Sequence, residues 1–140
     1  MASPYSHAPL AKKLVVRPNT RMLAIASPAG YRALLGELPA NTTYAETAAE
    51  AAGGINGTFD WIHLFLTTRA GLERHLPAAK THLRPEGVLW VSFPRAKQAT
   101  DLNRTLLMEL ARRFGLQPVT NVVVNDEWTA YRLKPVEGTD

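Results

Sequence analysis

The segment 59–68 constrains the fold more than any other stretch of the chain. It reads FDWIHLFLTT, with an acidic residue near its start, an apolar and β-prone middle, and two threonines at its end. A continuous apolar run without polar alternation is typical of a parallel strand that is covered on both faces. We therefore predict a buried central strand here, with other strands beside it and helices over it.

The rest of the chain alternates between strand and helix patterns. Strands are predicted at 21–26, 41–45, 88–93, 119–124 and 129–133, and helices at 9–16, 31–36, 46–52, 70–83 and 101–114. Asp101 is the expected N-cap of the last helix, and Pro77 is expected to kink the helix that contains it. The short connection at 125–128 implies an antiparallel pair. The predicted fold class is α/β: a three-layer α/β/α sandwich with a mostly parallel sheet and a C-terminal antiparallel hairpin.

The length of 140 residues suits one compact domain. We expect a single α/β domain at 9–135, with a flexible lead-in at 1–8 and a flexible tail at 136–140. No apolar segment approaches the roughly 20 residues of a membrane helix, and the N-terminal residues lack the pattern of a secretory signal. A cytoplasmic protein of bacterial type, without membrane contact, is therefore expected.

Several chemistries are excluded by composition and spacing. The chain has no Cys, which excludes disulfides, thiolate nucleophiles and Cys-ligated metal sites. His7, His75 and His82 are scattered without the spacing of metal ligands, so no metal site is predicted. P-loop, nucleophile-elbow and HExxH motifs are absent, and we predict no catalytic residue. We interpret His63, in the middle of the central strand, as a core histidine with satisfied hydrogen bonds.

The sequence is basic, with a net charge of +4 and a pI of about 9.7. Its cations are dispersed, however, and the doublets Lys12-Lys13 and Arg112-Arg113 are more typical of solvated helix faces than of a nucleic-acid footprint. A weak nucleic-acid-binding module, whose affinity would fall steeply with salt, is therefore only an alternative hypothesis.

Four polar stretches follow predicted strands. In mostly parallel sheets, ligands bind beyond the carboxyl ends of the strands, near the point where strand order reverses. Cations in these stretches, together with helix N-termini, would make this edge positive. We therefore predict that a small anionic ligand or a protein partner binds there. The candidate ligand-binding residues are Ser27, Gly30, Tyr31, Thr67, Arg69, Ser92, Arg95, Lys97, Asp126, Glu127 and Trp128.

The same residues also have plain structural interpretations. Arg69 and Lys97 would then be solvated loop charges, and Asp126-Glu127 a polar turn. Trp128 would cover the apolar border of the sheet without binding anything. An exposed edge strand near 42–45 could pair across a dimer.

The chain as a whole resembles class I methyltransferases. The resemblance lies in the strand at 21–26, DWIHLF at 60–65, LRPEGVLW at 83–90 and the closing hairpin. In that family the last strand inserts antiparallel into the sheet. The chain is more closely similar to a bacterial domain family of unknown function with a reduced methyltransferase-like, Rossmann-like fold. The matching phrases are PLAKKL at 9–14, SPAGY at 27–31, DWIHLF, VSFPR at 91–95 and DEWTAYRL at 126–133.

The loop after the first strand departs from the methyltransferase pattern. In methyltransferases this loop carries an acidic residue and several glycines, because the backbone approaches S-adenosylmethionine closely. Here it reads ASPAG: Pro28 removes a backbone donor and Ala29 adds a Cβ. The resemblance leaves Glu46 as the candidate for the acid that binds the ribose.

We therefore predict a non-catalytic or cryptic Rossmann-like domain without a cofactor. The alternative is a divergent S-adenosylmethionine-dependent methyltransferase. In it, Ser27 and Gly30 would shape the cofactor pocket, and Asp60 or Thr67 would lie near the methyl acceptor.

Overall fold

The strands of the protein form one mixed sheet. A computed structural model describes residues 9–55 and 57–136; the expected lead-in at 1–8 and residues 137–140 of the expected tail lie outside this range. The six strands have the spatial order β2-β1-β3-β4-β6-β5. They are β1 (Arg21–Ile25), β2 (Thr43–Thr47), β3 (Phe59–Phe65), β4 (Leu83–Pro94), β5 (Leu116–Val123) and β6 (Trp128–Pro135).

Strands β1 to β4 are parallel to one another, and β6 is antiparallel to both β4 and β5. The chain adds β2 on one side of β1 and then returns past β1 to form β3, so strand order reverses between β1 and β3. The predicted closing hairpin is confirmed. Its last strand is inserted between β4 and β5, as in the family that the sequence resembles.

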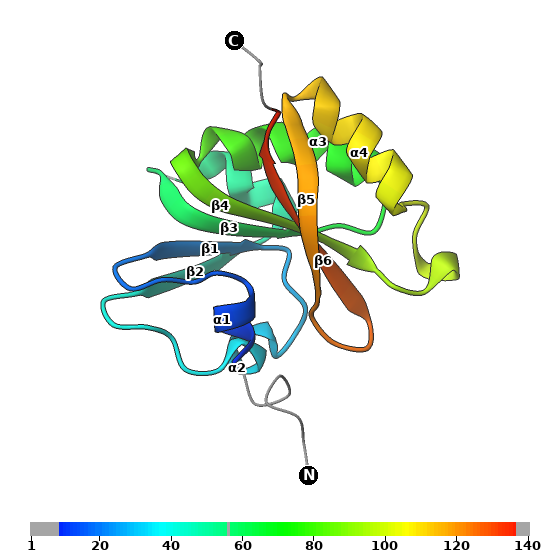
Figure 1. Ribbon diagram of the computed structural model, residues 1–140. Helices are drawn as coiled ribbons and strands as arrows, with labels where there is room; N and C mark the ends of the chain where they lie inside the picture. Colours follow the sequence, from blue (N-terminus) through cyan, green and yellow to red (C-terminus); the bar gives the residue numbers. More distant parts are fainter. Residues whose placement is uncertain (1–8, 56, 137–140) are drawn as a thin grey trace.

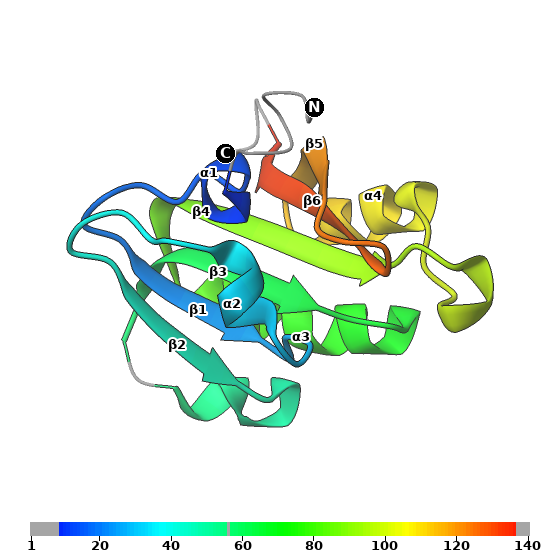
Figure 2. The same cartoon turned by 90° about the horizontal axis from the view of Figure 1, so that it is seen from below.

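Helices cover both faces of the sheet (Figure 1). One face carries α1 (Leu10–Lys13) and α2 (Tyr31–Leu35). The other carries the 3-10 helix η2 (Ala49–Gly54), α3 (Arg69–Thr81) and α4 (Arg104–Arg113), while η3 (Lys97–Ala99) lies in the loop after β4. Figure 2 shows α1 and α2 lying across the face that is turned toward the viewer. The predicted three-layer arrangement is confirmed.

The core has two layers that meet at β3. Side chains of Trp61, His63 and Phe65 are buried beneath α1 and α2, and the alternate residues Ile62 and Leu64 are buried beneath α3 and α4. Side chains alternate between the faces of a strand, so a strand covered on both sides must be apolar throughout. The largely apolar run at 61–66 has this physical cause.

Helix α1 is shorter than the predicted helix at 9–16. Val15 has a left-handed backbone (φ 62°), and the carbonyl oxygen of Leu14 accepts hydrogen bonds from the indole Nε1 of both Trp61 (2.9 Å) and Trp90 (2.7 Å). The Leu14 carbonyl, which a further helical turn would use as an acceptor, thus binds two buried indole N–H groups instead.

Three other predicted elements also differ. The helix expected at 46–52 is partly strand, because residues up to Thr47 pair with β1, and the remainder is η2. Helix α3 continues through Pro77 from residue 69 to residue 81. Strand β4 begins at Leu83, ahead of the predicted 88–93, and its first part pairs irregularly with β3.

Asp101 does not cap α4. The N-cap is Asn103, whose Oδ1 accepts from the backbone N–H of Leu106 at 2.8 Å. The carboxylate of Asp101 instead accepts from the backbone N–H of Arg69 at 2.7 Å, at the first residue of α3. Both helix N-termini thus have an oxygen acceptor, which their unpaired N–H groups require.

Candidate functional site

Most of the predicted residues lie along one edge of the sheet. The carboxyl ends of β1, β3 and β4 and the beginning of β6 share this edge, because β6 runs opposite to the other three. The backbone N–H of Arg95 donates to the carbonyl of Glu127 at 2.8 Å, and the rings of Phe65 and Trp128 lie 5.2 Å apart. We call this border the carboxyl edge.

Tyr31 and Ser92 lie inside the core and not on the surface of that edge. Their exposed fractions are 1% and 0%, and both side chains point to His63. The Tyr31 hydroxyl lies 2.5 Å from His63 Nδ1, and Ser92 Oγ lies 2.6 Å from His63 Nε2. Tyr31 therefore offers no exposed aromatic surface to a ligand at the carboxyl edge. Ser92 shares its face of β4 with Trp90, and this face is covered by α1 and α2.

His63 is a neutral core histidine. Burial lowers its pKa to about 3 and raises the pKa of Tyr31, so both groups carry no charge at neutral pH. A neutral imidazole has one donor and one acceptor nitrogen, and the two hydroxyls can satisfy both. The interpretation as a satisfied histidine is confirmed. Its partners are 32 and 29 residues away along the chain, so no local spacing could have identified them.

The exposed residues of the carboxyl edge are largely engaged with their own neighbours. Arg69 forms an ion pair with Glu73 at 3.2 Å. The Asn125 side chain accepts from the backbone N–H groups of Glu127 (2.8 Å) and Trp128 (3.0 Å), the geometry of a polar turn. Thr67 and Gly30 are exposed, and Gly30 has a φ of 82° at the N-cap of α2.

Two separate hollows lie on this edge. The first, which we call the β2 hollow, has a volume of about 530 Å³ and is lined by Ala26, Ser27 and residues 46–50. The carboxylate of Glu46 accepts from the hydroxyls of Ser27 (3.2 Å) and Tyr44 (2.5 Å). Burial, followed by the hydrogen bond to Glu46, raises the pKa of Tyr44, which keeps this phenol protonated.

The second hollow, the β4 hollow, has a volume of about 280 Å³. Three cations line it, namely Arg95, Lys97 and Arg104, and none of its lining residues is acidic. The stacked rings of Phe93 and Tyr131, 5.3 Å apart, supply an apolar wall. Helix α4 begins at Arg104, so the positive end of its dipole also lies here.

The candidate residues are thus divided. Ser27 lines the β2 hollow, and Arg95 and Lys97 line the β4 hollow. The other predicted residues line neither of them: Gly30, Tyr31, Thr67, Arg69, Ser92, Asp126, Glu127 and Trp128. Arg104 was not among the candidates, because these came from the stretches at the ends of predicted strands, and Arg104 lies within the helix predicted at 101–114.

Two structural features are absent from the described residues 9–55 and 57–136. No cluster of three or more His, Cys, Asp or Glu side chains is placed there to hold a metal ion. No helix in this part of the chain is both long and apolar enough to cross a membrane.

A family model described as "Protein of unknown function (DUF3052)" matches residues 60–137. No curated protein matches the sequence. The ribosomal protein L11 methylase of Lactobacillus delbrueckii subsp. bulgaricus is similar in structure, with a TM-score of 0.62 and 13% identity over 90% of this chain and 74% of the methylase chain.

Two other solved structures are also similar. One is a TehB-like SAM-dependent methyltransferase from Corynebacterium glutamicum, with a TM-score of 0.61 and 13% identity over 91% of this chain and 88% of its own. The other is DhpI in complex with SAH, with a TM-score of 0.59 and 14% identity over 96% and 87% of the two chains. These likenesses show the fold, which is that of class I methyltransferases.

The residues present fit S-adenosylmethionine only in part. Glu46 lies within β2, next to its end, where a ribose-binding acid would be needed. The loop after β1, however, has Ala26 at a positive φ of 58° and Pro28 without a backbone donor, and a Cβ on Gly30 would meet no atom within 4 Å. This loop does not form the close glycine cradle that the cofactor requires.

Asp60 is not near the carboxyl edge. It lies at the amino end of β3, where its carboxylate accepts from the backbone N–H of Arg21 at 2.8 Å and pairs with Arg84 at 3.2 Å. Asp60 and Thr67 lie at opposite ends of β3, so the alternative that places Asp60 beside a methyl acceptor at the carboxyl edge is wrong.

Proposed function

We propose that this chain, which belongs to the DUF3052 family, is a binding domain for a small anionic ligand. The ligand lies in the β4 hollow. The methyltransferase-like fold positions the residues of this hollow. The residues that line the hollow supply the chemistry, since fold alone does not imply activity.

Charge is the single observation that carries this proposal. Arg95, Lys97 and Arg104 surround one hollow, and no carboxylate lines it to neutralise them. Arg95 is positioned by its backbone bond to Glu127 and by a contact of its Nη1 with the Asn125 carbonyl at 3.5 Å. Guanidinium and ammonium donors at a helix N-terminus form charge-assisted hydrogen bonds with anions such as phosphate or carboxylate groups.

The shape of the hollow restricts the ligand further. Its volume of about 280 Å³ is close to the lower limit of small-molecule sites, which span about 300–1,000 Å³. The ring of Tyr131 and that of Phe93 favour a ligand with a flat apolar part beside its charge. A nucleoside monophosphate has both features.

Calorimetric titration with AMP tests the proposal, with uncharged adenosine as the matched ligand. We expect AMP to bind and adenosine to bind at least tenfold more weakly, because a charge-assisted hydrogen bond contributes about 1.5–3 kcal/mol. The double variant Lys97→Ala/Arg104→Ala should lose about tenfold in affinity for AMP. Arg112→Ala removes an exposed cation from the other end of α4 and should bind like the wild type.

Equal binding of AMP and adenosine would remove the charge argument. The proposal would also fail if the double variant, shown by circular dichroism to be folded, bound AMP as tightly as the wild type.

The β2 hollow supports a second candidate, the binding of an S-adenosyl nucleoside. Glu46 carries it: one carboxylate oxygen accepts from Ser27 and Tyr44, and the other oxygen has no hydrogen bond to a described residue. Ribose hydroxyls are suitable donors for that second oxygen. Titration with S-adenosylhomocysteine should then show binding that Glu46→Gln weakens about tenfold. Glu109→Gln, on the exposed face of α4, is the control, and a flat titration at millimolar ligand would end this candidate.

A further inference from the structure

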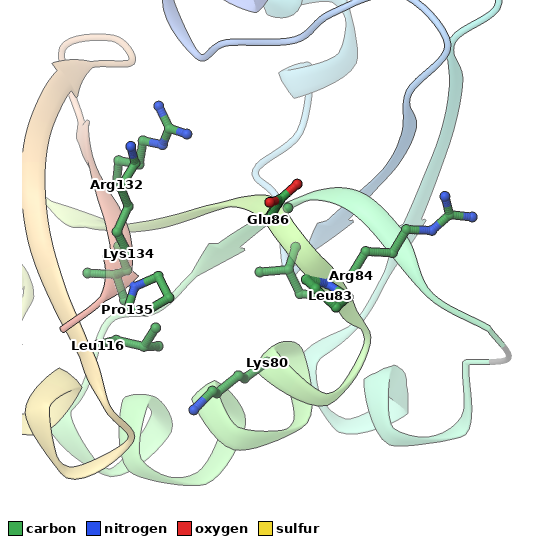
Figure 3. Close-up of a pocket in the computed structure, with 11 residues that line it drawn as sticks. Lys80, Leu83, Arg84, Glu86, Leu116, Arg132, Lys134 and Pro135 are labelled. Atoms are coloured by element: carbon green, nitrogen blue, oxygen red, sulfur yellow. The ribbon is translucent and has the colours of Figure 1, made fainter. Parts of the chain in front are cut away.

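A third cavity lies at the opposite edge of the sheet, between β4 and β6. Its volume is about 500 Å³, within the usual range of small-molecule sites, about 300–1,000 Å³. Figure 3 shows its two walls: Arg132, Lys134 and Pro135 of β6 on one side, and Leu83 and Glu86 of β4 on the other. We call it the amino-edge cavity, because it lies where β3 and β4 begin.

The cavity exists because β4 and β6 diverge there. The two strands pair from Leu89 opposite Leu133 to Pro94 opposite Trp128, and the earlier part of β4 has no partner in β6. That part also bulges away from β3: Phe59 is paired with Leu83, but Trp61 is paired with Val88. The divergence leaves a wedge that no side chain of the described residues fills.

The interior of the cavity combines apolar walls with positive charge. Its apolar residues come from three strands, β4, β5 and β6, and include Leu83, Pro85, Leu116, Leu133 and Pro135. Four cations and one carboxylate, that of Glu86, line it, and two of the cations are already engaged. Lys80 Nζ donates to the Phe114 carbonyl at 2.5 Å, and Arg84 pairs with Asp60 at 3.2 Å.

The other two cations, Arg132 and Lys134, lie two residues apart on the same face of β6. Neither side chain has a hydrogen bond or ion pair to another described residue, and the Nε of Arg132 is buried without an acceptor. Burial and the charge of Arg17 both lower the pKa of Arg132, so an anion beside it would relieve an unfavourable environment. A buried donor without an acceptor is costly, which indicates a group that arrives from outside.

We propose that the amino-edge cavity binds an amphipathic carboxylate, that is, a small molecule with an apolar body and one carboxylate head group. The head group lies between Arg132 and Lys134, where the planar guanidinium fork matches a carboxylate. The apolar body lies against the leucine and proline side chains of the wedge. This site is separate from the proposed anion site, which is at the carboxyl edge of the sheet.

Titration of the full chain with decanoate, below its micellar concentration, tests the inference. Two ligands separate its parts: decan-1-ol keeps the apolar body, and inorganic phosphate keeps an anionic charge. Decanoate should bind at least tenfold more tightly than either, because it alone uses both the cations and the wall. Lys134→Glu changes an exposed residue and should reduce decanoate affinity at least tenfold, and Arg132→Met, which keeps an apolar stem, should do the same.

Arg112→Ala and the double variant Lys97→Ala/Arg104→Ala serve as controls and should bind decanoate like the wild type. The inference is overturned if decan-1-ol binds as well as decanoate, or if the two cavity variants bind decanoate unchanged while still folded. If Lys97→Ala/Arg104→Ala lost decanoate binding while Lys134→Glu kept it, the ligand would lie in the β4 hollow. That result would overturn the inference as well.

Discussion

His63 shows how one buried polar residue is accommodated in this core. Its ring stacks on Phe65 with the centroids 4.0 Å apart, and the Trp61 ring lies nearly perpendicular to it with the centroids 5.7 Å apart. The hydroxyls of Tyr31 and Ser92 take its two nitrogens, so that three side chains from α2, β3 and β4 form one hydrogen-bonded chain. A buried hydrogen-bonded network of this kind favours one unique core packing only when every polar group in it has a partner.

We expect this arrangement to make stability fall with acidification. The pKa of His63 is about 3 in the folded protein, below the ordinary value of 6.5 that applies to the unfolded chain. Between these values the unfolded state binds a proton that the folded state does not, so lowering the pH favours unfolding. The contribution of His63 is complete above pH 6.5 and is lost as the pH falls toward 3. Between pH 7.5 and pH 5.0 this amounts to about 2 kcal/mol.

Urea unfolding of the wild type and His63→Phe at these two pH values measures the effect. The variant leaves two hydroxyls without their partner and should be less stable by about 1–3 kcal/mol at pH 7.5. Its deficit should shrink by about 2 kcal/mol at pH 5.0. His75→Gln removes a half-buried histidine and should keep the pH dependence of the wild type. A deficit that is the same at both pH values would show that His63 is not held neutral.

At the scale of elements, the irregular part of β4 decides the shape of the amino edge. Glu86 has a positive φ of 67°, and Gly87 follows it where the strand rejoins β3. A Cβ on Gly87 would lie 2.7 Å from a methyl carbon of Leu83 and 2.9 Å from the backbone carbonyl oxygen of Arg84. The chain is packed too closely here for any side chain.

Gly87→Ala should therefore be destabilising. The new methyl group forces a shift of Leu83 and of the backbone, and overpacking of this kind costs about 1–3 kcal/mol. Thermal and urea unfolding measure the loss. Gly54→Ala is the matched control, because a Cβ there meets nothing within 4 Å and should change stability by less than about 0.5 kcal/mol. Equal stabilities for the two variants would contradict the tight packing at Gly87.

Strands were easier to predict than helices in this chain, and the reason is visible at the ends of the elements. Strand β3 has an unbroken apolar run because it is covered on both faces. Helix ends instead depend on groups that are distant in sequence. The indoles of Trp61 and Trp90 donate to the Leu14 carbonyl at the end of α1. Asp101 accepts from the N-terminus of α3, and Asn103 caps α4. Residue types near a helix end indicate a cap, but they do not say which of two helices a side chain will reach.

The whole molecule carries positive charge on two opposite edges of one sheet. Arg95, Lys97 and Arg104 lie at the carboxyl edge, and Arg132 and Lys134 lie at the amino edge. The rule that ligands bind beyond the carboxyl ends of parallel strands predicted a site at the carboxyl edge alone. The residues that it selected lie along that edge but do not line a single hollow. The amino-edge cavity depends on the divergence of β4 from β6. We did not predict that divergence from the sequence of either strand.

The order of apolar and polar residues along the chain was sufficient for the α/β class, the buried central strand and the closing hairpin, because the period of side-chain burial is a local property. Composition likewise settled the absence of any cysteine chemistry. Strand order and register, by contrast, emerge only when the chain is folded. They bring the Tyr31 and Ser92 hydroxyls to His63 and the Ser27 hydroxyl to Glu46, and they separate two rows of cations into distinct hollows. Contacts between residues that are far apart in sequence leave no local pattern, and only the folded chain could reveal them.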